Sequence, residues 1–189
     1  MTRYIALLRG INVGGKNKII MTELKSSFER RGFENVRTYI NSGNVIFDGN
    51  LKEAEAKAVC ETMIADDFGL DIPVCIISAD DLMEALAHAP EWWDADLTSK
   101  HNALFVIPPM TTGAVLAQVG AVKPEYEKIG YYSKVIFWSA PIATFSRTRL
   151  TKIVQSKAAY NAITIRNANT TLKLTQLAAV EAALSAKEH

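Results

Sequence analysis

The sequence predicts an α+β protein whose two halves repeat one fold. In the N-terminal half, β-rich runs and helix-like segments alternate in the order β-α-β-β-α-β, which is typical of the split-βαβ or ferredoxin-like unit. The second observation is a repeat, because residues 44–47 (NVIF) match residues 134–137 (KVIF), 90 positions further along the chain. We therefore expect two tandem ferredoxin-like (βαββαβ) subdomains with a C-terminal helix.

The first elements of the N-terminal half follow from their residue types. Residues 4–8 form a short apolar strand, and Thr22 is a good N-cap for a helix that ends before Gly32. Only a tight Asn-Ser-Gly turn separates the β-rich runs 36–40 and 44–48. Two strands joined by so short a turn must be antiparallel, so these runs predict a hairpin.

The same half closes with a helix, a strand and a further helix. Residues 51–68 form the helix, and Gly69 ends it. Residues 73–77 (PVCII) form the strand, with its proline at the start, where a missing N–H is tolerated. Ser78 and Asp81 then make a capping pattern for a helix that runs to about residue 88.

The second half repeats this order after a loop-like segment at residues 90–100 (PEWWDADLTSK). We place the boundary in that segment, which gives domains at residues 1–96 and 97–189. The expected strands are 102–107, 125–130, 134–138 and 162–166, and the expected helices are 111–119 and 148–159. A final amphipathic helix at residues 171–186 carries Leu174, Leu177, Val180 and Leu184 at helical spacing and is expected to pack on the second sheet.

Composition excludes several classes of protein. The chain of 189 residues is 49% hydrophobic and 22% charged, with a net charge of +1, which is ordinary for a globular protein. Proteins held on duplex DNA by phosphate neutralisation are usually basic, so this charge argues against that class. Cys60 and Cys75 form no C-x-x-C pair and are interpreted as buried core residues.

Targeting signals are not evident in the sequence. The chain enters its first strand without a signal-peptide region, and no apolar run approaches the roughly 18 residues of a membrane span. We therefore expect a cytoplasmic protein without a membrane partner. His88, His101 and His189 lack zinc-ligand spacing, so no metal and no cofactor are expected.

The stretch GINVGGKN at residues 10–17 follows the first strand and nearly fits the phosphate-binding loop G-x-x-x-x-G-K-[ST]. Asn17 stands where that loop needs a magnesium-binding hydroxyl. The first N-cap signal for a helix is Thr22, whereas the helix of a P-loop starts at the Gly-Lys pair. The antiparallel hairpin also contradicts the parallel sheet of P-loop proteins. The run VIFD resembles an apolar strand that ends in a magnesium-binding Asp, but a role in a turn or cap is sufficient to explain Asp48. We therefore reject a nucleotide-hydrolysing P-loop.

A weaker anion-binding role for this stretch stays open. Gly10, Gly14 and Gly15 can expose backbone N–H groups as an anion-binding nest, and Arg9, Lys16 and Lys18 add positive charge. Alternatively, the glycines only shape a tight turn and the lysines lie in solvent.

Three motifs then point to a known family. The stretches ALLRGINVGGKNKI, YINSGNVIF and TIRNANTTLKL together resemble the uncharacterised bacterial domain of unknown function 1697 family, along essentially the whole chain. The resemblance implies a pair of ferredoxin-like subdomains and no established activity, substrate or catalytic residue. Where that family usually has tryptophan, this chain has Ala168, which weakens any hypothesis of stacking there.

Two further motifs have structural and functional interpretations. In RNANT (residues 166–170), the residues Asn169, Thr170 and Thr171 are expected to cap the last helix, and Arg166 is open to a role at a second anion site. The NSGN turn (residues 41–44) is expected far from the first loop, at the opposite end of the sheet.

A short basic cluster and an acidic linker complete the candidates. SRTRLTK places Arg147, Arg149 and Lys152 at a predicted helix start, which is unfavourable for the helix dipole. A solvated face is the simpler interpretation, and phosphate contact is the alternative. Residues 91–94 (EWWD) are interpreted as a linker whose tryptophans cover an interface.

Three functions remain open from the sequence. The first is a non-catalytic module that binds an anionic small molecule, a nucleotide or a short nucleic acid. The second is an enzyme acting on a phosphorylated small molecule, for which no general acid or base is evident, and the third is a structural or self-associating protein. The expected contact residues of the first are Arg9, Gly10, Asn12, Gly14, Gly15, Lys16 and Arg166.

Overall fold

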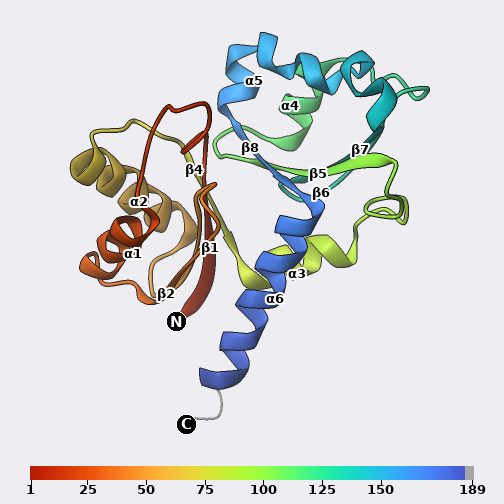
Figure 1. Ribbon diagram of the computed structural model, residues 1–189. Coiled ribbons are helices and arrows are strands. Elements are labelled where there is room, and N and C mark those ends of the chain that lie inside the picture. Colours follow the sequence, from red (N-terminus) through yellow and green to blue (C-terminus); the bar gives the residue numbers. More distant parts are fainter. Residues whose placement is uncertain (186–189) are drawn as a thin grey trace. The chain divides into compact units, whose positions relative to one another are not determined.

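The computed structural model describes the backbone of residues 1–185 and the side chains of residues 1–153 and 155–179. The chain groups into two compact units (Figure 1). The first contains Met1–Met83 and the segment from Leu172, and the second contains Glu84–Thr171. The predicted division at residues 1–96 and 97–189 assigns the C-terminal helix differently and stays a prediction. Both units combine an antiparallel sheet with helices, so the α+β class is confirmed.

The first unit is a four-stranded antiparallel sheet with strand order β2-β3-β1-β4. The helices α1 (Met21–Arg30) and α2 (Glu53–Phe68) lie on one side of it (Figure 1). The predicted hairpin between residues 36–40 and 44–48 is confirmed, because the second and third strands pair in antiparallel register. The elements are β1 (Thr2–Leu8), α1 (Met21–Arg30), β2 (Glu34–Tyr39), β3 (Asn44–Gly49), α2 (Glu53–Phe68) and β4 (Val74–Ser78).

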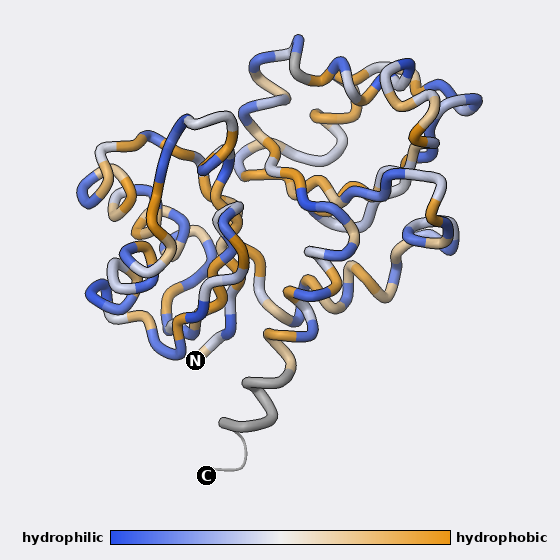
Figure 2. The backbone as a smooth tube through the Cα atoms, in the orientation of Figure 1, coloured by the Kyte–Doolittle hydropathy of each residue, from blue (hydrophilic) through white to orange (hydrophobic). Residues whose placement is uncertain are grey.

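An aromatic cluster fills the core between this sheet and its helices. Phe28 of α1 and Phe47 of β3 are fully buried, with ring centroids 5.3 Å apart. Phe33 adds a ring 4.5 Å from Phe47. Burying a side chain of this size contributes roughly 1.5–3 kcal/mol. Figure 2 shows that hydrophobic residues concentrate in the strands of the sheets.

Both cysteines are buried, as the sequence predicts. Cys60 lies in α2 and Cys75 in β4. Burial raises the pKa of the Cys60 thiol, with a smaller contribution from the negative charge of Glu61. A thiol held in this neutral form is a weak nucleophile, so Cys60 serves as a core residue.

Helix ends agree with the sequence in two places and differ in a third. Gly69 ends α2 in the left-handed conformation, and the Ser78 hydroxyl accepts a hydrogen bond from the Asp81 N–H at the start of α3 (Ala79–Ala87). Thr22, however, lies inside the first turn of α1, and Ile20 is the N-cap residue. The predicted cap at Thr22 is therefore wrong.

The second unit has its own four-stranded antiparallel sheet, with strand order β6-β7-β5-β8. Its regular elements are β5 (Ser99–Val106), α4 (Thr112–Val119), β6 (Lys128–Tyr132), β7 (Val135–Pro141), α5 (Lys157–Asn161) and β8 (Ile163–Asn167). The strand predicted at residues 125–130 begins three residues later, because Glu127 turns its carboxylate to the backbone N–H groups of Arg149 and Leu150.

The helix predicted at residues 148–159 is wrong. Two 3₁₀ helices, η1 (Ile142–Arg147) and η2 (Leu150–Gln155), precede the short α5. Thr148 separates them, because its hydroxyl donates to the Phe145 carbonyl and accepts from the Thr151 N–H. Such local bonds compete with a continuous helix.

The C-terminal helix α6 (Ala168–Ser185) starts earlier than predicted. Asn167 caps it by accepting a hydrogen bond from the Thr170 N–H, so Asn169, Thr170 and Thr171 are not the caps. Leu174 and Leu177 are buried, whereas Val180 and Leu184 lie outside the described side chains and residue 186 lies outside the described backbone. From Leu172 the helix groups with the first unit rather than with the second sheet.

Candidate functional site

The segment after β1 forms a fixed finger, and we call residues 9–18 the glycine finger. Val13 and Lys16 pair as an isolated antiparallel bridge, and the Lys16 N–H donates to the Val13 carbonyl at 3.1 Å. Gly14 and Gly15 between them have φ values of 59° and 75°, and a type I′ turn needs positive φ at both positions. The two glycines are therefore required by the turn itself.

Asn12 fixes the glycine finger at its base. Its side-chain oxygen accepts from the Ile19 N–H at 2.9 Å, and its amide nitrogen donates to the Ile19 carbonyl at 2.9 Å. The same nitrogen donates to the Asn41 carbonyl at 2.8 Å. One side chain therefore joins both ends of the finger to the turn between β2 and β3.

The expectation that the NSGN turn lies far from the first loop is wrong. Because β1 and β3 are antiparallel, Asn44 at the start of β3 pairs with Leu7 at the end of β1. The Leu8 N–H donates to the Gly43 carbonyl at 2.8 Å, and a Cβ at Gly43 would lie 2.8 Å from the Leu8 Cβ. The turn and the glycine finger therefore share one end of the sheet.

This end of the first unit combines positive charge with exposed apolar side chains. Residues 9–20 contain no acidic residue, Lys16 and Lys18 are exposed, and Arg9 is half-buried. Val13 at the finger tip is 65% exposed and Ile40 is 49% exposed. Ile40 also has a φ of 47°, which is strained for a β-branched residue. Strain of this kind clusters at functional sites.

Asp48 has a structural role that leaves it unsuited to metal binding. Arg3 donates to both of its carboxylate oxygens at 2.7 Å, and Asn35 donates to one of them at 2.8 Å. Burial raises the pKa of the Asp48 carboxyl, but the hydrogen bonds from Arg3 and Asn35 and the charge of Arg3 outweigh burial and lower it. This agrees with the rejection of the P-loop, as does the start of α1 at Met21, five residues beyond Lys16.

Arg166, the remaining sequence-predicted contact, lies in β8 of the second unit. It is 7% exposed, and its Nη1 donates to the Thr164 hydroxyl and to the Ile165 carbonyl, both at 2.9 Å. The structure brings Arg9, Gly10, Asn12, Gly14, Gly15 and Lys16 together in the glycine finger, and Arg166 is a largely buried residue of the other sheet.

Comparison with known proteins identifies the family. The profile of the family described as Protein of unknown function (DUF1697) matches residues 1–137. The chain belongs to this DUF1697 family. It is also similar to the conserved bacterial protein SP0830 from Streptococcus pneumoniae, with 34% identity and a TM-score of 0.84 over 94% of this chain and 98% of that one. A search of curated proteins found no match.

This DUF1697 chain also has a polar cavity of about 410 Å³ in its second unit, which the sequence did not predict. His101 lies in its wall together with Ala168, the position at which this chain has alanine where the family usually has tryptophan. His101 Nε2 lies 2.8 Å from the Asp96 carbonyl oxygen, which only accepts, so Nε2 carries the proton. Nδ1 then accepts from the Ser139 hydroxyl at 2.6 Å. Both ring nitrogens are occupied, which suits a structural histidine.

No local sequence pattern could have revealed the hydrogen bond between His101 and Ser139, because the pairing of two strands brings these residues together. His101 and Ser139 face each other across β5 and β7, although they are 38 residues apart in the sequence.

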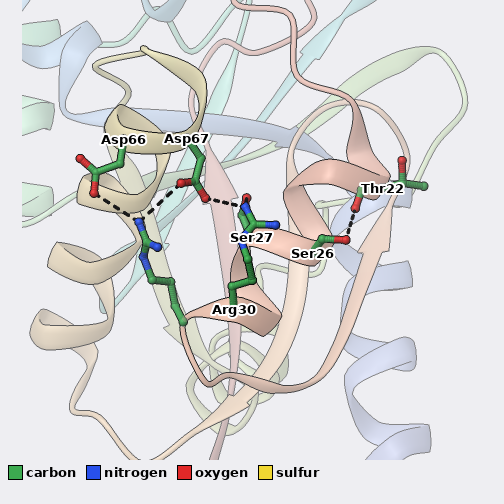
Figure 3. Close-up of polar contacts among 7 residues, drawn as sticks. Thr22, Ser26, Ser27, Arg30, Asp66 and Asp67 are labelled. Atoms are coloured by element: carbon green, nitrogen blue, oxygen red, sulfur yellow. Dashed lines mark hydrogen bonds and ion pairs between the residues drawn. The ribbon is translucent and has the colours of Figure 1, made fainter.

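A groove of about 480 Å³ between α1 and α2 of this family member is also polar, and Figure 3 shows its contacts. Arg30 donates to the Ser27 hydroxyl at 2.8 Å and to Asp67 at 2.9 Å, and Arg31 lies 3.2 Å from Asp66. The hydrogen bond from Ser27 is the main cause that lowers the pKa of Asp67. The hydrogen bond from Arg30 and the positive charges of Arg31 and Arg30 lower it further. Arg30 and Arg31 pair with Asp67 and Asp66 and so join the two helices, while Glu23 adds a negative charge to the wall of the groove. The groove therefore does not offer a cationic site.

The described residues offer neither a metal cluster nor a membrane span. Among them, His, Cys, Asp and Glu side chains form no group of three with metal-binding geometry. Of the helices in the described part of the chain, none combines the length and the apolar character needed to cross a bilayer.

Proposed function

We propose that this protein is a non-catalytic module that binds an anionic ligand through the glycine finger. The ligand class is a nucleotide, a phosphorylated metabolite or a short nucleic acid. The observation that carries the proposal is the glycine finger itself. It is fixed by hydrogen bonds of Asn12, it is largely exposed, and it contains cationic side chains but no acidic residue. A site fixed before binding loses little conformational entropy when the ligand arrives.

The residues of the glycine finger divide into two roles in this proposal. Arg9, Lys16 and the backbone N–H groups of Gly10, Gly14 and Gly15 supply positive charge and donors, as in anion-binding nests. Asn12 positions them, since its side-chain amide is engaged by Ile19 and Asn41. Arg166 is left out of the contact set because it is largely buried and bonded within its own strand.

Binding without catalysis is favoured by what the finger contains. Residues 9–18 carry no His, Cys, Asp, Glu or Tyr side chain, so of the usual general acids and bases the finger offers lysine alone. The carboxylate of Asp48, in β3 of the same unit, is bonded to Arg3 and Asn35. A reaction at this site would therefore depend on Lys16 or Lys18, or on an acid or base from elsewhere.

We also propose that each unit is a ferredoxin-like subdomain and that the pair arose by duplication. In support, the two sheets have corresponding strand orders, β2-β3-β1-β4 and β6-β7-β5-β8, and all pairs are antiparallel. The matching runs NVIF and KVIF lie in β3 and at the start of β7, which are the central hairpin strands of the two sheets.

Isothermal titration calorimetry with ATP, a sugar phosphate and a short DNA single strand tests the proposed function. We expect at least one to bind, about ten-fold more weakly to Lys16→Ala, because a hydrogen bond to a charged group contributes about 1.5–3 kcal/mol. Lys25→Ala is the control, since it removes the same charge from the exposed side of α1. Failure of all three ligands, or equal effects of both variants, would contradict the proposal. ATP binding that requires magnesium would instead favour a P-loop.

A further inference from the structure

Two cations of the second unit occupy one face of a 3₁₀ helix. Arg149 is the N-cap residue of η2 and Lys152 follows three positions later, with its N–H donating to the Arg149 carbonyl at 3.0 Å. Side chains at i and i+3 eclipse in a 3₁₀ helix, so both cations lie on the same side, and both are exposed. Neighbouring like charges are unfavourable unless an anion lies between them.

Arg149 is held in place by two hydrogen bonds and has room for its guanidinium beside Gly120. Its Nε donates to the Val119 carbonyl at the end of α4, at 2.9 Å. Gly120, with a φ of 77°, leaves room for the guanidinium, because a Cβ there would lie 3.3 Å from Nη2. The backbone N–H of Arg149 donates to the Glu127 carboxylate at 2.7 Å.

Glu127 anchors this segment from the interior. It is 3% exposed, and its carboxylate accepts from the backbone N–H groups of Lys123, Arg149 and Leu150. Its oxygens are thus engaged with the backbone, and it belongs to the support of the η2 segment rather than to the face that carries the two cations.

A cavity of about 270 Å³ opens on this cationic face, and among the described residues no carboxylate lines its wall. The Ser156 hydroxyl donates to the Gln118 side-chain oxygen at 2.7 Å. This bond uses one lone pair of that oxygen, and the NH₂ group of Gln118 supplies N–H donors. The volume lies just below the range of about 300–1,000 Å³ for drug-sized ligands. The polar side chains of the wall are Gln118, Arg149, Lys152, Gln155 and Ser156.

We propose that this cavity is a phosphate-binding site, which takes inorganic phosphate or the phosphate group of a small phosphomonoester. Arg149 supplies the planar donor fork that matches phosphate oxygens, and Lys152 supplies a second charge. The amide of Gln118 completes a set of donors on an otherwise neutral wall. The site lies in the second unit, whereas the glycine finger belongs to the first.

Calorimetric titration of the full chain with sodium phosphate and with a sugar phosphate, in low-salt buffer without sulfate, tests the proposal. We expect binding of at least one probe, weakened about ten-fold by Arg149→Gln and by Lys152→Ala. Lys157→Ala is the matched control, because Lys157 is an exposed cation of the neighbouring α5 that lies outside the cavity wall. Lys16→Ala should leave this binding unchanged, which separates it from the glycine finger.

Several results would overturn the proposed phosphate site. The first is no binding of either probe at millimolar concentration, and the second is an equal loss in Lys152→Ala and Lys157→Ala, which indicates a general charge effect. Loss of binding in Lys16→Ala alone would place the phosphate at the glycine finger instead. If Arg149→Gln is destabilised by losing its bond to Val119, the comparison of Lys152→Ala with Lys157→Ala decides the matter, since both are exposed positions.

Discussion

Arg3 and Asp48 form a two-bond ion pair across the neighbouring strands β1 and β3. The side chains of both residues are about nine-tenths buried. Removing one partner of a buried pair leaves the other charge without compensation, at a cost of about 3 kcal/mol or more. The pair is therefore a sensitive point in the stability of the first unit.

The stabilisation from Asp48 should depend on pH in a definite direction. Its folded pKa is lowered below the usual value of about 3.9, so its contribution is present above that pH and is lost as the pH falls through the folded pKa. We expect Asp48→Asn to lower the free energy of unfolding by about 3 kcal/mol at pH 7, with the difference from wild type shrinking below pH ~4. Urea unfolding from pH 7 to 2 measures this.

Asp71→Asn is the control for this experiment, because Asp71 is an exposed carboxylate of the same unit. A stability difference between wild type and Asp48→Asn that stays constant over the whole pH range would contradict the argument.

Gly43 is a second sensitive residue, since two neighbours occupy the space where a side chain would begin. A Cβ there would lie 2.8 Å from both the Leu8 Cβ and the Ile11 Cδ1, and the φ of 78° disfavours any other residue. We expect Gly43→Ala to destabilise the protein by about 1–3 kcal/mol. Gly113→Ala is the control, because a Cβ at Gly113 meets nothing within 4 Å. Equal thermal unfolding midpoints of the two variants would refute the prediction.

At the scale of elements, the glycine finger depends on Asn12. Asn12→Ala removes three hydrogen bonds to Ile19 and Asn41 while the Gly14-Gly15 turn stays intact. We expect a loss of about 2–3 kcal/mol, because each such bond contributes about 1 kcal/mol. Hydrogen exchange should accelerate most at the amide of Ile19, because its N–H donates to the Asn12 side chain, whereas the amide of Lys16 stays bonded to the Val13 carbonyl within the turn. Ser26→Ala, on the exposed side of α1, is the control, and uniform acceleration over the whole first unit would count against a local role.

The elements differ in how far local sequence determined them. The hairpin of β2 and β3 and the end of α2 at Gly69 were predicted, because their signals lie within a few residues. The role of Asn12 was not predicted, since its partner Asn41 is 29 residues away. The η1–η2 segment was also missed, because Thr148 breaks it locally and Glu127 holds it from another element.

At the scale of the whole molecule, the α+β class followed from the order of elements alone. The grouping of α6 with the first unit did not, because it rests on contacts such as the hydrogen bond from Arg3 to the Ala178 carbonyl, which joins residues 175 positions apart. The finger residues could be grouped from the sequence because they are contiguous, and their role as a ligand site stays a prediction. The burial of Arg166 could not be seen from the sequence, because it depends on the packing of β8.

Net charge gives a prediction for the whole chain. With a net charge of +1, the protein lacks the excess of cations that non-specific binding to duplex DNA requires. We expect no binding to a duplex by fluorescence anisotropy at physiological salt, whereas a short single strand stays a candidate ligand of the glycine finger. Tight duplex binding that falls steeply with salt would reveal a basic surface and would contradict this expectation.

The discontinuity of the first unit has a consequence for the order in which the chain is made. Its sheet lies within Met1–Met83, but the helix residues that group with it begin at Leu172, after the whole of Glu84–Thr171. During synthesis the second unit is therefore complete before Ala178 is available to Arg3. A nascent chain halted after Thr171 carries one finished unit and one that still awaits its last helix.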